Sequence, residues 1–283
     1  MNSDIFRYKY RFVSFCLLFG YAFIHFHLTG VYVEIPLDKL IDFSVRLPFN
    51  QRVLVPALAH GIAYFVPIEI NNLFFLLEWL FTSLFYFALL NLLQLEFPPR
   101  QAQLLSWLCL LVLPLMTVIN YRLPYGGEAN LFYPYDTATL FFMTLGFFFC
   151  LRKEWHYFIP WIFISTFNRE SSLLLVLLIP TLYWQTIQSV LKPLLCAILA
   201  YLLARIIIIY CLQGSPGAWV EWYYYQYTHF EANLIWLLND QNIALFVFCL
   251  MGLPLFWFSF FDYIPAFYRP LRYLILFYFL VLL

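Results

Sequence analysis

Residues 193–212 read PLLCAILAYLLARIIIIYCL, a stretch of 20 residues in which Arg205 is the only charged side chain. A helix of about 20 apolar residues is long enough to cross the hydrocarbon core of a bilayer. Residues 72–95, NLFFLLEWLFTSLFYFALLNLLQL, have the same character and carry Glu78 as their only charge. Two such stretches in one chain indicate helices that lie in a membrane.

The composition of the whole chain leads to the same class of protein. Its 283 residues are 64% hydrophobic and 11% charged, against roughly 45–50% and 25% in soluble domains. So few charges cannot cover so much apolar surface in water, which excludes an ordinary soluble domain. The 15 Lys and Arg balance the 15 Asp and Glu, so no nucleic-acid partner is expected. We therefore expect an all-α fold, a polytopic transmembrane helical bundle that forms a single integral membrane domain over residues 1–283.

Apolar runs between charges and Pro or Gly breaks mark the expected membrane spans. The run at 53–67 is too short for a span, and it contains Pro56, His60 and Gly61. We expect this run and residues 37–47 to form amphipathic surface helices in the first outer loop. The expected spans are 12–30, 72–95, 104–120, 137–151, 156–167, 171–186, 193–212, 243–261 and 272–283.

Basic residues predict which ends of the spans face the cytoplasm, because cytoplasmic loops are enriched in Lys and Arg. Treating 156–186 as a helical hairpin and 53–67 as an outer helix places most basic residues on one side. Making 53–67 a span would move most of that group outside. The sequence therefore predicts a cytoplasmic N-terminus and long outer loops. The basic residues expected inside are Arg7, Lys9, Arg11, Arg100, Arg152, Lys153, Lys192, Arg269 and Arg272.

The first outer loop, GVYVEIPLDKLIDFSVRLPFNQRVLVPALAH, is the richest in candidate functional residues. Asp38, Asp42 and Arg46 recur every four residues, which places them on one face of a helix. Glu34, Asp38 and Asp42 are candidate general bases, and Arg46 and Arg52 are candidate anion-binding residues. The alternative is a solvated helix whose Asp42–Arg46 pair contributes only a few tenths of a kcal/mol.

The later outer loops add further candidates. Arg122 and Arg169 lie on the side expected to be poor in basic residues, and Arg169 at a hairpin tip suggests a buried pair or an anion site. Asp136 precedes a helix, so a simple N-cap is its alternative interpretation. The substrate-binding candidates are Arg46, Arg52, His60, Arg122, Glu128, Asp136, Arg169 and Glu170.

Glu78 and Arg205 are the charges inside expected spans. Each lies six or seven residues from the outer end of its span, so both are roughly 10 Å below the outer surface at about 1.5 Å per residue. An unpaired charge at that depth costs several kcal/mol. We expect Glu78 and Arg205 to form an intramembrane pair or to line one polar cavity. The alternative has Arg205 extend outward alone while Glu78 stays protonated.

The order of these features resembles the GT-C class of polytopic membrane glycosyltransferases, which use polyprenyl-phosphate-linked sugar donors. The resemblance covers roughly the first 190 residues and rests on layout. A first span is followed at once by an acidic residue, Glu34, then by a surface helix and the segment QRVLVPAL. The resemblance implies that Glu34 is the catalytic carboxylate, with Asp38 and Asp42 as alternatives. It implies that the lipid phosphate is bound by Arg46, Arg52, Arg122 and Arg169.

The favoured prediction is transfer of a sugar from a polyprenyl-phosphate-linked donor to an acceptor on the outer face of the membrane, in the cell envelope. A lipid or solute transporter is an alternative. Transporters place charged residues near the bilayer midplane, and Glu78 and Arg205 lie inside expected spans. A non-catalytic assembly subunit would use the apolar faces only for packing. A membrane O-acyltransferase would need an outward histidine, for which His60 is the candidate. Membrane lipid is the expected partner, no cofactor is indicated, and a divalent cation stays open.

Overall fold

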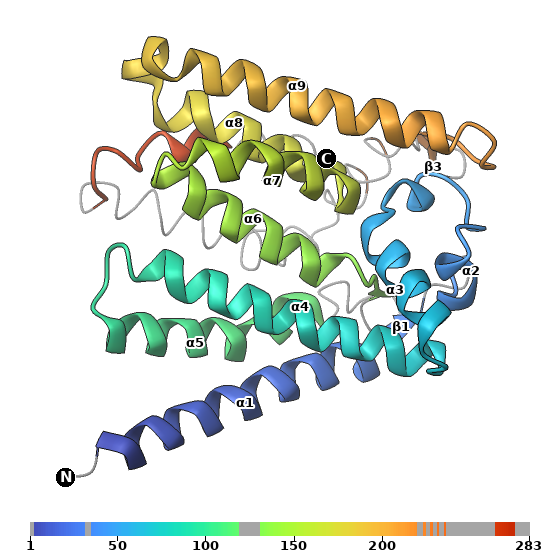
Figure 1. Ribbon diagram of the computed structural model, residues 1–283, viewed down its shortest axis with the longest axis horizontal. Coiled ribbons are helices and arrows are strands. Elements are labelled where there is room, and N and C mark those ends of the chain that lie inside the picture. The colour runs from blue at the N-terminus through green and yellow to red at the C-terminus, as the bar shows by residue number, and fades with distance from the viewer. Residues whose placement is uncertain are drawn as a thin grey trace.

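The computed structural model describes residues 3–31, 35–118, 131–219 and 264–274, together with 223–224, 227–228, 231 and 235 (Figure 1). This part of the chain is mostly helical with almost no strands, which agrees with the expected all-α class. Its longer helices are α1 (Ser3–Leu28), α4 (Ile70–Leu93), α5 (Pro99–Thr117), α6 (Asp136–Leu151), α7 (Trp155–Asn168), α8 (Leu173–Leu182) and α9 (Ile187–Cys211).

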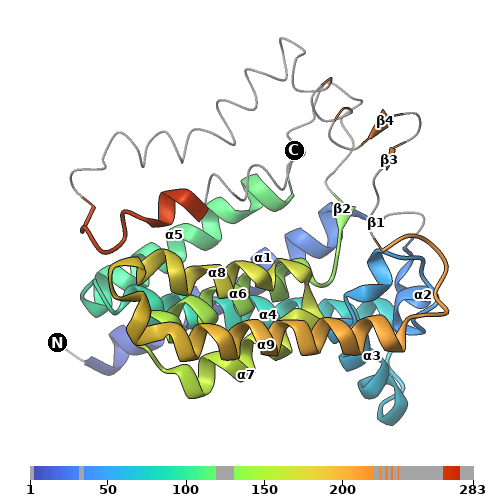
Figure 2. The same cartoon turned by 90° about the horizontal axis from the view of Figure 1, so that it is seen from above.

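These helices run alternately in opposite directions along one axis, so their ends fall into two groups (Figures 1 and 2). We call the end at which α1 begins the proximal end; α4 ends and α9 begins there too. The opposite end, where α4 and α6 begin and α9 ends, is the distal end. α1 packs against α4 and α5, α4 against α6, and α6 against α7 and α8, while α9 covers α7 and α8.

Three described helical segments are long and apolar enough to cross a membrane: Tyr8–Leu28, Ile70–Leu93 and Trp184–Cys211. On α9 the exposed side chains form an apolar stripe that no described helix covers. Leu195, Leu199, Leu202 and Ile206 are all exposed, and their spacing of three or four residues places them on one helix face. A continuous apolar face of this kind is suited to contact with lipid.

The hairpin expected at 156–186 is present. α7 ends at Asn168, and a 3-10 turn, Glu170–Ser172, leads directly into α8. A second 3-10 turn, Trp184–Thr186, connects α8 to α9. The span expected at 243–261 lies outside the described residues, as does all of 272–283 except its first three residues, which are helical. The arrangement of all the helices as a transmembrane bundle stays a prediction.

The first loop differs from the expected helix at 37–47. α2 covers only Leu37–Ile41, because Phe43 has a φ of 55°, outside the right-handed helical region. A 3-10 turn, Phe49–Gln51, then leads to α3 (Leu54–Phe65), close to the helix expected at 53–67. The 12 residues of α3 extend only about 18 Å, less than a bilayer core.

The apolar side of the first loop, which we expect to lie on the membrane surface, is covered by other parts of the protein. Leu37, Leu40, Ile41 and Val45 are all buried in one hydrophobic cluster. α2 packs on α3 and α4. The apolar face is therefore covered by protein, and its placement on a membrane surface stays a prediction.

Short backbone contacts connect segments that are far apart in sequence at the distal end. β1 (Gly30–Val31) pairs in parallel with β2 (Leu131–Phe132), which brings the end of α1 to the start of α6. The Leu47 amide donates to the Pro216 carbonyl at 2.7 Å. Gly217 has a φ of 102°, and a Cβ there would lie 2.7 Å from the Leu47 carbonyl oxygen, so glycine is required at this position.

A small antiparallel pair follows α9. β3 (Tyr223–Tyr224) pairs with β4 (Tyr227–Thr228). Only the backbone of these residues is described, so the aromatic side chains of the segment carry no structural argument.

Helices α6 and α8 approach closely at Gly146. A Cβ at this position would lie 2.7 Å from both Cδ atoms of Leu175, and Leu175 is fully buried. An added methyl group would therefore have to displace a core side chain that has little room to move.

We expect Gly146→Ala to lower the thermal unfolding midpoint in detergent, because overpacking a filled core costs about 1–3 kcal/mol. Gly61→Ala in α3 is the matched control, since nothing lies within 4 Å of its Cβ position. Alanine is favoured over glycine in a helix by roughly 0.5–1 kcal/mol, so this control should be neutral or slightly stabilising. An unchanged midpoint for Gly146→Ala would contradict the close approach of α6 and α8.

Candidate functional site

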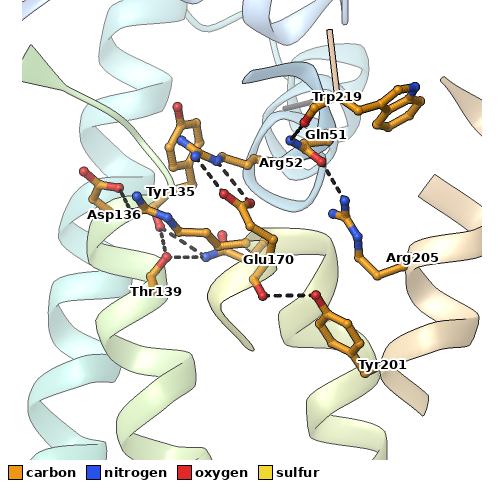
Figure 3. Close-up of polar contacts among 11 residues, drawn as sticks. Gln51, Arg52, Tyr135, Asp136, Thr139, Glu170, Tyr201, Arg205 and Trp219 are labelled. Atoms are coloured by element: carbon orange, nitrogen blue, oxygen red, sulfur yellow. Dashed lines mark hydrogen bonds and ion pairs between the residues drawn. The ribbon is translucent and has the colours of Figure 1, made fainter. Parts of the chain in front are cut away.

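Two ion pairs lie side by side at the distal end and come from three separate segments (Figure 3). Arg52, just before α3, donates to the Glu170 carboxylate through Nη2 at 2.9 Å and Nε at 3.4 Å. Arg169 donates through Nη1 to Oδ1 of Asp136 at 2.6 Å. Arg169 and Glu170 are consecutive, so the four side chains form one group without net charge. We call Arg52, Asp136, Arg169 and Glu170 the charge network.

The members of the charge network differ in exposure. The Arg52 side chain is 12% exposed, whereas Glu170 is 39% exposed. Arg169 and Asp136 are 33% and 36% exposed. Arg52 therefore lies on the inner side of the network, and the other three residues are accessible to a ligand.

Arg52 is also held by aromatic rings. Its guanidinium carbon lies 4.7 Å from the ring centroid of Tyr135 and 5.9 Å from that of Phe49. A cation over an aromatic face is attracted by the ring quadrupole, and the attraction increases when water is excluded. These contacts help to offset the cost of removing the Arg52 charge from water.

The hairpin tip is fixed to the start of α6 by Asn168. Its Nδ2 donates to the Tyr135 carbonyl at 3.1 Å and to Oγ1 of Thr139 at 2.9 Å. The neighbouring Asp136 is the first residue of α6, and the N-cap is Tyr135. The interpretation of Asp136 as a simple N-cap is therefore wrong, because its carboxylate is oriented by Arg169.

The network shifts the proton affinities of its two carboxyl groups in opposite directions. Burial alone would raise the pKa of Glu170, but the adjacent Arg52 outweighs burial and lowers that pKa below its ordinary value. Burial raises the pKa of Asp136, and Arg169 only partly offsets the rise. For Arg52, burial would lower the pKa, but its interactions with Tyr135 and Glu170 outweigh burial and raise it. Glu170 is thus held as an anion, and Asp136 is the better proton acceptor.

Helix α9 contributes a further cation beside the network. Arg205 donates through Nη2 to Oε1 of Gln51 at 2.8 Å, and Gln51 donates to the Trp219 carbonyl at 3.3 Å. Tyr201, one turn earlier, donates its hydroxyl to the backbone carbonyl of Glu170 at 3.4 Å. Within the described residues the buried Nη1 of Arg205 has no hydrogen-bond partner. A guanidinium with an unused donor can bind an anionic oxygen.

A second polar cluster is buried between α1, α4 and α6. The Glu78 side chain is 0% exposed, and its Oε1 lies 2.8 Å from Nδ1 of His25. Thr137 donates its hydroxyl to the same oxygen at 2.6 Å. In the described part of the chain, Oε2 of Glu78 has no hydrogen-bond partner. A buried carboxyl group with one free oxygen marks a functional candidate in a membrane protein.

The expected direct pair between Glu78 and Arg205 is wrong. Glu78 interacts with His25 and Thr137, whereas Arg205 bonds to Gln51. The two charges lie on α4 and α9, and the layers formed by α6 and α7 separate these helices (Figure 1). Similar depth along the helix axis therefore did not place them beside each other.

The structure does not bring the other described candidates into the charge network. Asp38 and Asp42 are exposed, and within the described residues their carboxylates form no hydrogen bond or ion pair. His60 is exposed, with Nδ1 3.1 Å from the Ile41 carbonyl. Arg46 donates to the Leu47 carbonyl at 3.2 Å and lies over a Phe ring. Their functional roles stay predictions.

Three candidates lie outside the described residues: Glu34, Arg122 and Glu128. The carboxylate that the GT-C resemblance assigns to catalysis is among them. Its convergence with the charge network stays a prediction.

Sequence reasoning missed several residues that position the network. Gln51, Tyr135 and Tyr201 are ordinary residue types for a loop or a helix, and nothing in their spacing indicates a role. His25 had a usable signal, because it is a titratable residue inside an apolar run and needs a polar partner there.

The described residues contain no group of three or more His, Cys, Asp or Glu side chains that could hold a metal ion. Comparisons with protein-family models, curated proteins and solved structures find no match to this chain.

A double-mutant cycle tests whether the Arg52–Glu170 pair organises the site. Arg52→Gln and Glu170→Gln should each lower stability by about 1–3 kcal/mol, because each leaves a buried or partly buried charge unpaired. The double variant should lose less than the sum of the two. Thermal unfolding in detergent provides the measurement.

The matched control for this cycle is the Arg152–Glu154 pair at the proximal end. Its N–O distance is 2.7 Å, and Arg152 is 51% exposed. Exposed pairs contribute roughly 0–1 kcal/mol, so both single variants should be nearly neutral. Equal effects at the two pairs would show that the charge network has no special structural role.

Proposed function

We propose that this protein is a membrane glycosyltransferase that moves a sugar from a polyprenyl-phosphate-linked donor to an acceptor on the outer face of the membrane. The observation that carries the proposal is the charge network, with Arg205 beside it. Cations, a carboxylate with increased proton affinity and accessible surface come together at one end of helices long enough to span a bilayer. This combination suits a reaction that removes a proton and releases a phosphate.

Asp136 is the proposed general base. Its raised pKa makes it a better proton acceptor than Glu170, and its side chain is 36% exposed. It would take the proton of the acceptor hydroxyl while that oxygen bonds to the anomeric carbon of the sugar. The bond between the anomeric carbon and the phosphate oxygen breaks, and its electron pair leaves with the lipid phosphate.

Arg205 and Arg169 are the proposed phosphate-binding residues. The buried Nη1 of Arg205, which has no hydrogen-bond partner among the described residues, would donate to a phosphate oxygen that reaches it. Arg205 lies on the helix whose outer face is apolar. Arg169 is 33% exposed beside Asp136. Cations placed where negative charge develops lower the barrier to departure of the phosphate. Arg52 has a structural role, because its hydrogen bonds to Glu170 hold the first loop against the tip of the α7–α8 hairpin.

The GT-C resemblance adds Glu34 as a second candidate carboxylate. The segment that contains it connects β1 to Ile35, and β1 pairs with β2 only a few residues before Asp136. This neighbourhood is compatible with Glu34 and Asp136 sharing the binding of one acceptor. Asp38, Asp42 and His60 have no described contact that supports a part in the reaction.

A transporter is the second candidate function, and the buried His25–Glu78 pair favours it. Ionisable residues inside membrane helices often mark proton or ion pathways. The two functions predict that substitution of different residues abolishes activity. Transport would depend on His25 and Glu78, whereas glycosyl transfer would depend first on Asp136, Arg169 and Arg205.

Binding of polyprenyl phosphate to the purified protein tests the proposed function. Native mass spectrometry with added C55 polyprenyl phosphate should show a bound lipid. Arg205→Gln should weaken binding by about tenfold or more, since one hydrogen bond to a charged group contributes roughly 1.5–3 kcal/mol. Asp136→Asn should retain the lipid but lower sugar transfer from extracted lipid-linked sugars by about 10²–10⁴-fold.

Lys192→Gln is the matched control for this experiment, because it removes a charge from the proximal end of the same helix. It should leave lipid binding unchanged. Absence of binding to the wild-type protein, or equal effects of Arg205→Gln and Lys192→Gln, would rule out the proposed phosphate site. Full transfer activity in Asp136→Asn would rule out its role as the base.

Cysteine labelling tests the proposed sidedness. In a background with the native cysteines replaced by serine, Asp42→Cys should react with a membrane-impermeant maleimide added outside intact cells. Arg152→Cys, at the opposite end of the helices, should react only after permeabilisation. The opposite result for the two variants would place the charge network on the cytoplasmic side.

A further inference from the structure

A groove lies between α1, α4 and α5, away from the charge network. Its volume is about 320 Å³, and its walls are mostly apolar. Phe15 and Leu18 line it from α1, while Trp79, Phe87 and Leu90 line it from α4. Ligand pockets range from about 300 to 1,000 Å³, so the groove has room for a narrow ligand such as one hydrocarbon chain.

Hydrogen-bonded polar side chains lie along the groove, and the apolar Phe87 and Leu90 lie nearer its proximal end. Ser14 and Tyr86 share a hydrogen bond of 3.0 Å, and Gln103 of α5 donates to the Ser14 hydroxyl at 3.3 Å. Trp107 donates its ring N–H to the same hydroxyl at 3.0 Å. These bonds connect the three helices beside the groove.

Arg11 lines the groove on the proximal side of Ser14. Its side chain is exposed, and within the described part of the chain it has no hydrogen-bond or ion-pair partner. Arg11 also lies inside the apolar segment Tyr8–Leu28. An arginine near the end of a membrane helix extends its guanidinium to the level of the lipid headgroups.

The length of the groove matches one leaflet of a bilayer. From Arg11 to Leu18 the helix rises about 10 Å, and from Trp79 to Leu90 about 16 Å, at 1.5 Å per residue. Half of a bilayer hydrocarbon core is roughly 15 Å. Arg11 therefore lies at the headgroup level, and the apolar groove extends from it over about the length of an acyl chain.

We propose that this groove binds an anionic glycerophospholipid, with its phosphate at Arg11 and one acyl chain between α1 and α4. Charge complementarity selects the headgroup, because Arg11 is a cation with no hydrogen-bond or ion-pair partner among the described residues. The apolar walls favour a hydrocarbon chain, because they offer few polar groups to a hydrophilic ligand. This lipid site is separate from the charge network and does not depend on the proposed transferase activity.

Photo-crosslinking in nanodiscs tests the site. The full chain is reconstituted with a trace of phosphatidylglycerol or phosphatidylcholine carrying the same diazirine-labelled chain, and the labelled peptides are identified by mass spectrometry. Labelling should concentrate on the peptides that contain Phe15, Leu18, Phe87 and Leu90. It should be at least about fivefold stronger with phosphatidylglycerol than with phosphatidylcholine.

Two kinds of variant separate the headgroup from the chain. Arg11→Gln should reduce the ratio of phosphatidylglycerol to phosphatidylcholine labelling to about one. Ser83→Trp, which places a large ring in the groove, should abolish labelling by both lipids. If Ser83→Trp does not fold, Leu90→Trp fills the groove about two helical turns away and should have the same effect. Lys192→Gln removes a proximal charge outside the groove, and it should leave the ratio unchanged.

Equal labelling of the wild-type protein by both lipids would overturn the proposal, as would labelling that stays strong in both filled variants. Complete displacement of the phosphatidylglycerol label by an equimolar amount of C55 polyprenyl phosphate would overturn the choice of a phospholipid as the occupant. Failure of the charge network to bind polyprenyl phosphate has no effect on these outcomes, so the two proposals can fail separately.

Discussion

The structure depends on the constraint that a charge removed from water needs a partner. Only 11% of the residues are charged, and several of these lie against apolar helices. Arg52 satisfies the constraint with two hydrogen bonds to Glu170 and two aromatic rings. Because Arg52 precedes α3 while Glu170 lies between α7 and α8, this pair joins the first loop to the hairpin.

The same constraint shapes the rest of the distal end. Asp136 and Arg169 connect the start of α6 to the hairpin, and Asn168 reinforces that connection through Tyr135 and Thr139. Gln51 gives Arg205 a partner and joins α9 to the first loop. At this end, ion pairs and hydrogen bonds of side-chain amides therefore hold the segments together, whereas apolar packing holds the helices together along their length. Their arrangement leaves three charged side chains partly exposed, as a binding site requires.

The polar groups buried between α1, α4 and α6 are less accessible than the charge network. Glu78 is shielded from water and bonded to Thr137 and His25, so its environment is far less open than that of Asp136. In the groove near Arg11, polar groups are satisfied by one another, whereas Arg11 has no hydrogen-bond or ion-pair partner in the part of the chain that the structure describes. Partial exposure distinguishes the charge network and the groove from the buried His25–Glu78 pair, which favours transport instead.

The sequence by itself determined the helical class, the hairpin at 156–186 and which side of the first loop is apolar. These features follow from local periodicity and from long apolar runs, which are properties of neighbouring residues. The partners of Glu78 and Arg205, and the meeting of Arg52 with Glu170, were decided only by the tertiary structure. Pairing depends on which helices become neighbours, and two residues at the same depth can be separated by other layers. The helix at 37–47 was overestimated, because Phe43 adopts a left-handed conformation that ends the helix soon after Ile41.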